Sequence, residues 1–530
     1  MLWERQGSSE ETAHNDHSLV FDDLTPKEMV QVKRYLEYNL GVPLVDPPQA
    51  KPSDNCIYSI VLQLPPKAEV LEFLDHQGIR PTREALTVVY FGNQKDPNVT
   101  EYVVGPLPKP TYHQDVTVQK YGGKVPYYRR FLLKMDLIRI FLFLAINEYS
   151  KAPNFMHKVI GFDGINLIFM LALPPGLKSG DRKIWLCQFQ NVFGYHVHPV
   201  GLEVQVDISS LDISQWKVVK VFYNGQYFED MGDIERQYNQ GQVKVAKVKK
   251  APLNGGYSSL KPRVPPKGQG PLQYEPREPR YSIKNNQVIF MGWSFAFGMD
   301  ANRGPRIFDL RFKGERIVYE ISIQDASAHY GSNNPALMLT RYMDISWGLG
   351  YNSFTLTQGV DCPYLATYLD RHYFIDSSSP VTRKNSICIF EQNAEMPVRR
   401  HYTSILIPFY GALADSVLVL RAISSVSNYD YIWDFIFHQN GAVQVRIHPS
   451  GYIQSSFYFG DAREFGNRVE EWTLGTIHTH NIQYKVDMDI GDFICRLNMS
   501  MRLCIGGNSR ARPVIQLSLA RKPLQLANLW

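Results

Sequence analysis

Two histidines one residue apart, His478 and His480, lie in the segment LGTIHTHNIQYKVDMDI. In an extended strand, residues i and i+2 point to the same face, so both imidazoles can reach one ion. Imidazole suits copper, zinc, iron or nickel, but two nitrogens leave a metal site incomplete, and a third ligand has to come from elsewhere. A second pair, His196 and His198, offers no other ligand. For either pair taken alone, two surface or packed histidines are the alternative.

Residues 427–434 read SNYDYIWD. By themselves they are compatible with an aromatic strand followed by a turn. Because the histidine pair follows 49 residues downstream, Asn428-Tyr429-Asp430-Tyr431 resembles the N-Y-D/E-Y signature of the copper amine oxidases. In that family, the tyrosine that matches Tyr429 is converted to topaquinone.

The resemblance covers residues 20–490 and points to the vertebrate membrane primary amine oxidases of the vascular adhesion and retina-specific types. It implies two small α+β domains, a large antiparallel β-sandwich catalytic domain and a homodimer. Taken together, the matching stretches are too specific to be a chance match of short motifs. They are 51–56 (KPSDNC), 104–108 (VGPLP), 201–203 (GLE), 304–308 (GPRIF), 314–320 (GERIVYE), 359–367 (GVDCPYLAT) and 399–401 (RRH).

Around Tyr429, the resemblance implies roles for residues that match the family's pattern by position. Asp344, which lies 85 residues before Tyr429, matches the catalytic base, and Tyr342 matches the aromatic gate. Tyr330 matches the tyrosine that hydrogen-bonds to the quinone, and Asn428 matches the asparagine that restrains the quinone ring. His478 and His480 match two copper ligands.

These residue types suit the oxidation of a primary amine. The reaction needs an electrophilic carbonyl, which no ordinary side chain supplies, so the protein makes a cofactor from tyrosine with copper and O₂. A proton must then leave the Cα of the substrate, and a carboxylate in a dry pocket has a raised pKa and can accept it. The expected products are an aldehyde, ammonia and hydrogen peroxide. Ser427 stands where the vascular type has a bulky leucine, which predicts a roomier pocket that accepts aromatic amines.

The resemblance also implies sites away from Tyr429. Asp487 and Asp489, with the Met488 carbonyl between them, match a structural calcium site, and hard oxygen ligands at i and i+2 suit Ca²⁺. A solvated strand face is the alternative. Cys362 and Cys388 match a disulfide of the family, and Cys56 and Cys187 are expected to be buried free thiols. Asn98 lies in a glycosylation sequon, Asn98-Val99-Thr100.

The predicted elements agree with the implied fold class, which is α+β and mainly β. Thr25, Pro26 and Glu28 form a capping box that begins a helix. We expect a disordered tail over 1–18, followed by small α+β domains over 19–122 and 123–250. Residues 251–280 are rich in Pro and Gly and predict a linker or a long surface loop. The first part of the β-sandwich is expected over 281–491, built of short alternating strands, and a basic tail over 492–530.

Composition and motifs exclude several other classes. The chain has 530 residues, of which 44% are hydrophobic and 20% charged, so it is globular and long enough for about three domains. Its net charge of +5 is too weak to predict a nucleic-acid partner. No GxGxxG, P-loop, GxSxG or HExxH motif occurs. No signal peptide or anchor is visible, although the family predicts an extracellular or cell-surface enzyme with an N-terminal membrane anchor.

The end of the chain departs from the family's pattern. The third copper histidine is expected farther past His480 than the 50 residues that remain. From Phe493 onward, the chain contains no Asp or Glu. We therefore expect a fragment or truncated gene product, whose basic tail is out-of-frame or intronic sequence rather than a nucleic-acid-binding arm.

Three hypotheses compete. The first is a copper- and topaquinone-dependent primary amine oxidase, acting on a primary amine and O₂. The second is a truncated, catalytically inactive relative that serves as an interaction protein. The third, a metal-binding β-sandwich of another class, is disfavoured by the combined N-Y-D-Y, Y-x-D and H-x-H spacings.

Overall fold

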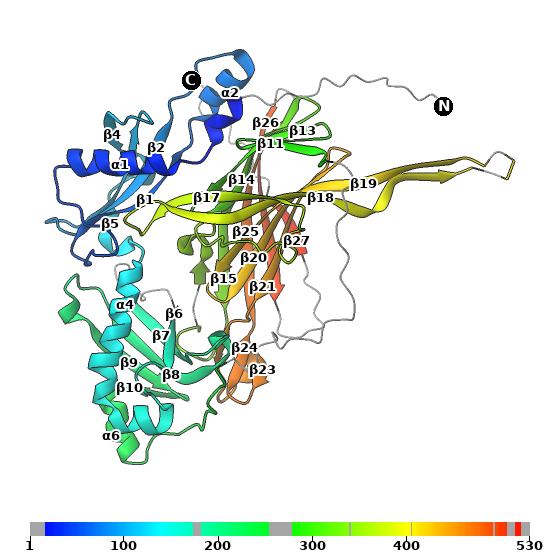
Figure 1. Cartoon of the computed structure of the whole chain (residues 1–530). Coiled ribbons are helices and arrows are strands. Elements are labelled where there is room, and N and C mark those ends of the chain that lie inside the picture. Colours follow the sequence, from blue (N-terminus) through cyan, green and yellow to red (C-terminus); the bar gives the residue numbers. More distant parts are fainter. Residues whose placement is uncertain are drawn as a thin grey trace.

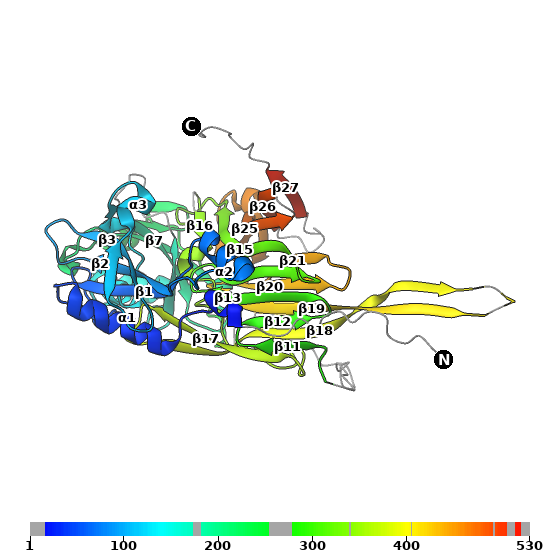
Figure 2. The same cartoon turned by 90° about the horizontal axis from the view of Figure 1, so that it is seen from above.

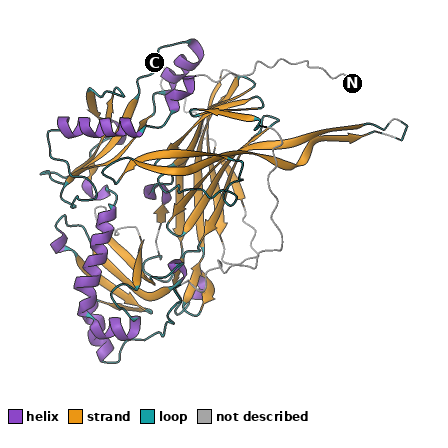
Figure 3. Cartoon of the chain, viewed as in Figure 1, coloured by secondary structure: helices purple, strands orange, loops and turns teal. Residues whose placement is uncertain are grey.

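The computed structural model describes residues 16–172, 182–253, 278–338, 341–403, 405–406, 408–490, 493–505 and 515–520, the last two segments by their backbone. The described part consists mainly of antiparallel sheets, with helices gathered at one side (Figures 1 and 3). The predicted fold class, α+β and mainly β, is confirmed. None of the helices in these ranges is long and apolar enough to cross a membrane.

The first sheet joins strands from distant parts of the chain. Its junction is the antiparallel pair β1 and β17, in which Ser59 opposes Ile375 and Ile60 opposes Phe374. The first α+β unit therefore shares one sheet with the β-rich region, and each covers a strand edge that the other would leave open. The order is β21 (Val443–Gly451), β20 (Tyr429–His438), β19 (Tyr410–Val426), β18 (Val381–Tyr402), β17 (Thr367–Ile375), β1 (Asn55–Gln63), β2 (Glu84–Phe91), β3 (Asn98–Gly105) and β4 (Tyr112–Asp115), with β5 (Val125–Pro126) beside β3.

Three further sheets complete the described strands. The second has the order β10 (Gln226–Phe228), β9 (Lys217–Tyr223), β8 (Pro199–Asp207), β7 (Lys183–Gln190) and β6 (Leu167–Ala172). The third has the order β11 (Tyr281–Lys284), β12 (Gln287–Phe290), β13 (Trp293–Asp300), β14 (Gly304–Phe312), β15 (Glu315–Tyr330), β25 (His478–Ile490), β26 (Phe493–Ile505) and β27 (Ile515–Ala520), with β16 (Arg341–Met343) beside β15. The fourth is β22 (Ser455–Phe457), β24 (Thr473–Thr476) and β23 (Gly466–Glu470).

The helices lie mostly in the first half of the chain. The predicted capping box is present at the start of α1, where the Glu28 N–H donates to Thr25 Oγ1 (3.2 Å) and the Thr25 N–H donates to Glu28 Oε2 (2.8 Å). Helix α4 is followed directly by a π-helical segment, Phe143–Glu148. The α-helices are α1 (Pro26–Asn39), α2 (Lys67–His76), α3 (Thr117–Tyr121), α4 (Lys134–Leu142), α5 (Pro153–Phe155) and α6 (Met231–Asn239).

The largest apolar core lies between the third sheet and strands β17 to β21. Phe295 of β13 stacks on Phe437 of β20 with ring centroids 4.2 Å apart. The Trp293 indole N–H donates to the His438 carbonyl oxygen (2.7 Å). These contacts make two face-packed layers, with β20 in one and β25 in the other. A site formed by both strands must therefore lie between the layers.

The structure corrects some predicted bounds. Residues 16–18, expected in a disordered tail, belong to a 3₁₀-helix, Asp16–Phe21, because Phe21 is buried and stacks on Phe308. The strands β18 and β19 have 22 and 17 residues rather than the short lengths expected. They continue as a two-stranded arm beyond the sandwich (Figure 2). Residues 1–15, most of the linker 251–280 and part of the tail 492–530 lie outside the described residues.

Candidate active site

Tyr429 begins β20 directly after a tight turn. Val426 of β19 pairs with Tyr429, so Ser427 and Asn428 alone connect the two strands. Ser427 has φ 54°, a left-handed conformation that is uncommon for a residue other than glycine. A turn of this kind fits the twist of a two-residue hairpin. It places the Tyr429 side chain at the end of the sheet, where it is 6% exposed.

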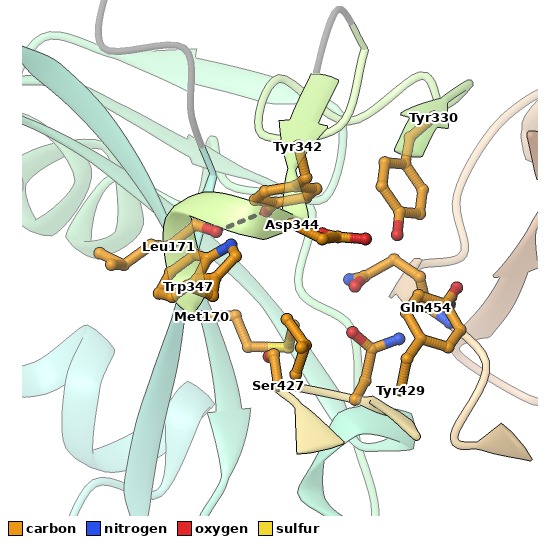
Figure 4. A pocket seen from close by; sticks show the side chains of 11 residues that line it. Met170, Leu171, Tyr330, Tyr342, Asp344, Trp347, Ser427, Tyr429 and Gln454 are labelled. Atoms are coloured by element: carbon orange, nitrogen blue, oxygen red, sulfur yellow. Dashed lines mark hydrogen bonds between the residues drawn. The ribbon is translucent and has the colours of Figure 1, made fainter. Parts of the chain in front are cut away.

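The Tyr429 hydroxyl lies among polar groups from several elements. Its oxygen is 2.5 Å from His478 Nε2. The Tyr330 hydroxyl and the Asn428 side chain hydrogen-bond to it, and the Gln454 N–H donates to it at 3.4 Å. Figure 4 shows the Tyr330 hydroxyl directed toward the Tyr429 ring, with Gln454 beside it. Burial raises the pKa of Tyr429 above its usual value, so the hydroxyl is protonated.

The contacts of His478 and His480 assign their tautomers. His478 Nδ1 lies 2.8 Å from the Thr476 carbonyl oxygen, to which it donates. Its Nε2 therefore carries a lone pair and accepts from Tyr429. His480 Nδ1 lies 2.7 Å from the Tyr431 hydroxyl, which donates its own proton to Asp344 Oδ2 (2.6 Å). His480 Nδ1 must then be the donor of its pair, which leaves the lone pair on Nε2.

Both imidazoles are neutral. Burial lowers the pKa of His478 to about 4 and that of His480 to about 3. His480 Nε2 is buried and has no hydrogen-bond partner within the described part of the chain. A buried acceptor without a partner is costly and calls for a ligand. The pair thus presents two imidazole lone pairs beside the Tyr429 hydroxyl.

Asp344 is a buried carboxyl group in the same region. It begins the 3₁₀-helix Asp344–Trp347 and is 5% exposed. Burial raises its pKa to about 7, the Tyr431 hydrogen bond lowers it, and the charge of Asp325 raises it further. A carboxyl group with this pKa can accept and release a proton near neutral pH.

A pocket connects these groups. The Tyr342 hydroxyl donates to the Leu171 carbonyl oxygen (2.5 Å) and so joins β16 to β6 of the second sheet (Figure 4). The cavity has a volume of about 30 Å³, enough for one or two water molecules. Its lining is Met170, Leu171, Tyr330, Tyr342, Asp344, Trp347, Val426, Ser427, Asn428, Tyr429 and Gln454.

Comparison with known proteins identifies the architecture. Family models match residues 282–501 (copper amine oxidase, enzyme domain), 30–113 (copper amine oxidase, N2 domain) and 195–260 (a domain of unknown function). The lung isozyme of primary amine oxidase from Bos taurus is 48% identical over 493 residues, 92% of this chain and 64% of that relative. The copper-containing amine oxidase 3 of Homo sapiens is 46% identical over 489 residues, 91% of this chain and 64% of the relative. This chain belongs to the copper amine oxidase family.

Solved structures of the family agree. The lysyl oxidase of Pichia pastoris superposes with a TM-score of 0.81 at 26% identity, over 95% of this chain and 70% of that one. The amine oxidase of Aspergillus nidulans gives a TM-score of 0.77 at 27% identity, over 94% of this chain and 69% of that one. This copper amine oxidase chain spans about 64% of the length of the curated relatives named above.

The histidine pair fits the family's metal. Neutral imidazole nitrogens are suitable copper ligands, and metal-bound histidines usually donate their other ring N–H to an oxygen atom. His478 does so to Thr476 and His480 to Tyr431. The second pair is different, because His196 Nδ1 lies 3.4 Å from the sulfur atom of Met170.

Sequence reasoning missed several residues of this candidate site. Tyr431 links Asp344 to His480, and its position two residues after Tyr429 on one strand was an available signal. Gln454, Met170 and Trp347 line the pocket but come from segments without a distinguishing pattern. Only the tertiary structure brings them to Tyr429.

The other predicted residues lie away from this pocket. Cys362 and Cys388 form the predicted disulfide, and Cys56 and Cys187 are buried free thiols. Asn98 begins β3 and is half-buried. Asp487 and Asp489 lie near the far end of β25, where both contact Lys67.

Proposed function

We propose that this protein oxidises primary amines to aldehydes, with release of ammonia and hydrogen peroxide, using copper and a topaquinone formed from Tyr429. The observation that carries the proposal is the position of the Tyr429 hydroxyl, 2.5 Å from His478 Nε2, in one pocket with the buried carboxyl of Asp344. His478 and His480 are the proposed copper ligands. When bound, copper and the quinone supply the redox chemistry and the electrophilic carbonyl.

The chain's own residues serve proton transfer and positioning in this proposal. Asp344 accepts the proton that leaves the substrate Cα, and its pKa of about 7 leaves a useful fraction ionised at neutral pH. The Tyr431 O–H holds one carboxylate oxygen and fixes the direction of the other. Tyr330 and Asn428 hold the side chain of residue 429 in place through their hydrogen bonds to the Tyr429 hydroxyl.

Tyr342 closes the pocket toward the second sheet. Its hydroxyl is held by the Leu171 carbonyl, and its ring packs edge-on against Tyr330 at 5.5 Å between centroids. Because the cavity holds only one or two waters, an amine with a side chain must displace part of the wall. We assign Tyr342 as the gate, since the hydrogen bond that holds its hydroxyl to the Leu171 carbonyl can be broken and remade.

Formation of the quinone tests the proposal directly. The chain is expressed without copper, then incubated with CuSO₄ under O₂ or under argon, and treated with phenylhydrazine. We expect a phenylhydrazine adduct on the peptide that contains residue 429, dependent on both copper and O₂ and absent from Tyr429→Phe. An unmodified Tyr429 peptide after incubation with both, together with no bound copper, would overturn the proposal and favour a catalytically inactive relative.

The substrate class is proposed to include aromatic amines such as phenylethylamine and tyramine. Ser427 lines the pocket beside Trp347 and Met170, and its small side chain leaves room next to the residue 429 ring. Ser427→Leu should lower the ratio of kcat/KM for tyramine to that for methylamine by about tenfold or more, the scale of a few methylene groups in a pocket. Ser427→Ala is the control and should leave the ratio unchanged. An equal ratio in all three proteins contradicts the assignment.

The remaining assignments are also proposals. The Cys362–Cys388 disulfide supports an extracellular or cell-surface location, because disulfides persist in oxidising compartments. The arm β18–β19 presents large exposed apolar side chains, among them Met396, Ile405 and Leu406, which supports a homodimer with the arm in the interface. A glycan on Asn98 remains a proposal as well.

A further inference from the structure

The carboxylates of Asp487 and Asp489 share the ammonium group of one lysine. Lys67 Nζ lies 2.9 Å from Asp487 Oδ1 and 2.8 Å from Asp489 Oδ1. Lys67 is the first residue of α2, so these contacts connect a helix near the start of the chain to β25, more than 400 residues later. The position between the two carboxylates is thereby filled by a cation that belongs to the protein.

The contacts of this lysine are largely shielded from solvent. Asp487 is 1% exposed and Lys67 16% exposed at the side chain, so the attraction between them is weakly screened. The Lys67 ammonium also lies 4.8 Å from the centre of the Tyr319 ring, a distance typical of cation–π contacts. A second lysine, Lys485, pairs with Glu320 and lies 3.9 Å from Asp487 Oδ2.

A calcium ion fits this arrangement poorly. Ca²⁺ takes about six to eight oxygen ligands at roughly 2.3–2.6 Å, and the two carboxylates with the Met488 carbonyl supply fewer. Glu320, the acid across from Asp487 on β15, is already paired with Lys485. Across the described ranges of the chain, no group of three or more His, Cys, Asp or Glu side chains is arranged to hold a metal.

We propose that the Lys67 ammonium is the resident cation of the Asp487–Asp489 pair, and that the pair fastens α2 to β25 instead of holding calcium. Ca²⁺ can enter only by displacing Lys67. The other end of α2 is held independently, because Asp75 accepts hydrogen bonds from Arg311 (2.7 Å) and Arg316 (2.5 Å). Loss of the Lys67 contact should therefore release the first turn of α2 without detaching the helix.

Calcium titration of Lys67 variants tests this proposal. Wild-type protein and Lys67→Arg should show no saturable heat of binding with CaCl₂ up to about 1 mM, the range of weak extracellular calcium sites. Lys67→Met should bind Ca²⁺ about tenfold or more tightly, since a positive charge less than 3 Å from both carboxylates is removed. Adding Asp489→Asn to Lys67→Met should abolish the gained binding.

Hydrogen exchange gives a second readout that is independent of calcium. The amides from Val70 onward in α2, which donate to carbonyl groups of the first turn and of Pro66, should exchange faster in Lys67→Met than in wild type, whereas Lys120→Met, which removes a surface pair with Glu101, should leave them unchanged. Saturable calcium binding by the wild type, unaltered in Lys67→Met, would overturn the proposal. So would wild-type exchange rates in Lys67→Met. If Lys67→Met does not fold, the wild-type titration alone decides. No step of amine oxidation enters these tests, so their outcome is separate from that of the proposed function.

Discussion

Each end of strand β25 carries two potential metal ligands at positions i and i+2, but the groups that surround the two pairs are of opposite kinds. At one end, His478 and His480 are neutral, and the neighbouring group is the Tyr429 hydroxyl. At the other end, Asp487 and Asp489 form salt bridges with Lys67. The histidine end keeps a buried lone pair at His480 Nε2 without a partner in the described structure, whereas both carboxylates have a cation.

This difference shows what spacing alone leaves open. An i, i+2 pair on a strand places two side chains on one face, but the elements that approach that face decide what they bind. The turn before β20 delivers a tyrosine to the histidines. Helix α2 delivers a lysine to the aspartates. We therefore expect a metal to affect the first end strongly and the second end little.

Loss of a ligand at the histidine end should have the largest effect. His480→Ala removes one of two imidazole lone pairs, and we expect copper affinity to fall by more than about 100-fold, beyond the range typical of outer-shell substitutions. Copper binding is measured by titration calorimetry in the absence of O₂. His198→Ala, taken from the second histidine pair, is the matched control and should bind copper like the wild type. Equal affinities for the two variants would contradict the assignment of His480.

Loss of the cation at the aspartate end should reduce stability. Lys67→Met leaves two carboxylates without their nearest cation, and we expect the free energy of unfolding to fall by about 2 kcal/mol, less than for a fully buried pair, because Lys485 remains nearby. Urea denaturation measures this change. Lys120→Met, at an exposed pair, should cost about 0.5 kcal/mol or less. Similar losses of unfolding free energy in both variants would show that the Lys67 contacts stabilise the protein no more than an exposed ion pair does.

Removal of the group behind the histidines should have a smaller effect. Tyr431→Phe deletes the oxygen that accepts from His480 Nδ1 and the O–H that donates to Asp344. Outer-shell substitutions of this kind lower metal affinity by about 10–100-fold, and we expect the low end of that range because the Nε2 ligand atom remains. Calorimetry with copper measures the loss. A phenylalanine variant with wild-type affinity would mean that Tyr431 positions Asp344 only.

The sequence predicted the identities of the site residues better than their connections. The spacing of Asp344, Tyr429 and the histidine pair, read through the family resemblance, named groups that lie around one pocket or directly beside it. The capping box predicted the start of α1 because every partner lies within four residues. In contrast, Lys67 and Asp487 are 420 residues apart, and β1 pairs with β17, with Ser59 opposite Ile375, across more than 300 residues. No local pattern encodes such contacts, since they arise when apolar faces from separate segments pack together.

The smallest expected effect is the contribution of Asp344 to the pH dependence of stability. Burial raises the pKa of Asp344 from 3.8 to about 7, so between about pH 4 and pH 7 the folded chain holds a proton that the unfolded chain has lost. The stability contributed by this group is therefore full below about pH 4, falls as the pH rises toward 7, and is constant above that value. Asp344→Asn should remove this fall, which is seen as the pH dependence of the urea midpoint. Tyr431→Phe retains the carboxyl group but removes a hydrogen bond that favours its ionised form, so it should keep the fall and extend it to higher pH. Parallel curves for wild type and Asp344→Asn between pH 4 and 7 would show that the carboxyl is not desolvated, and Asp344 would then lack the basicity that its proposed role requires.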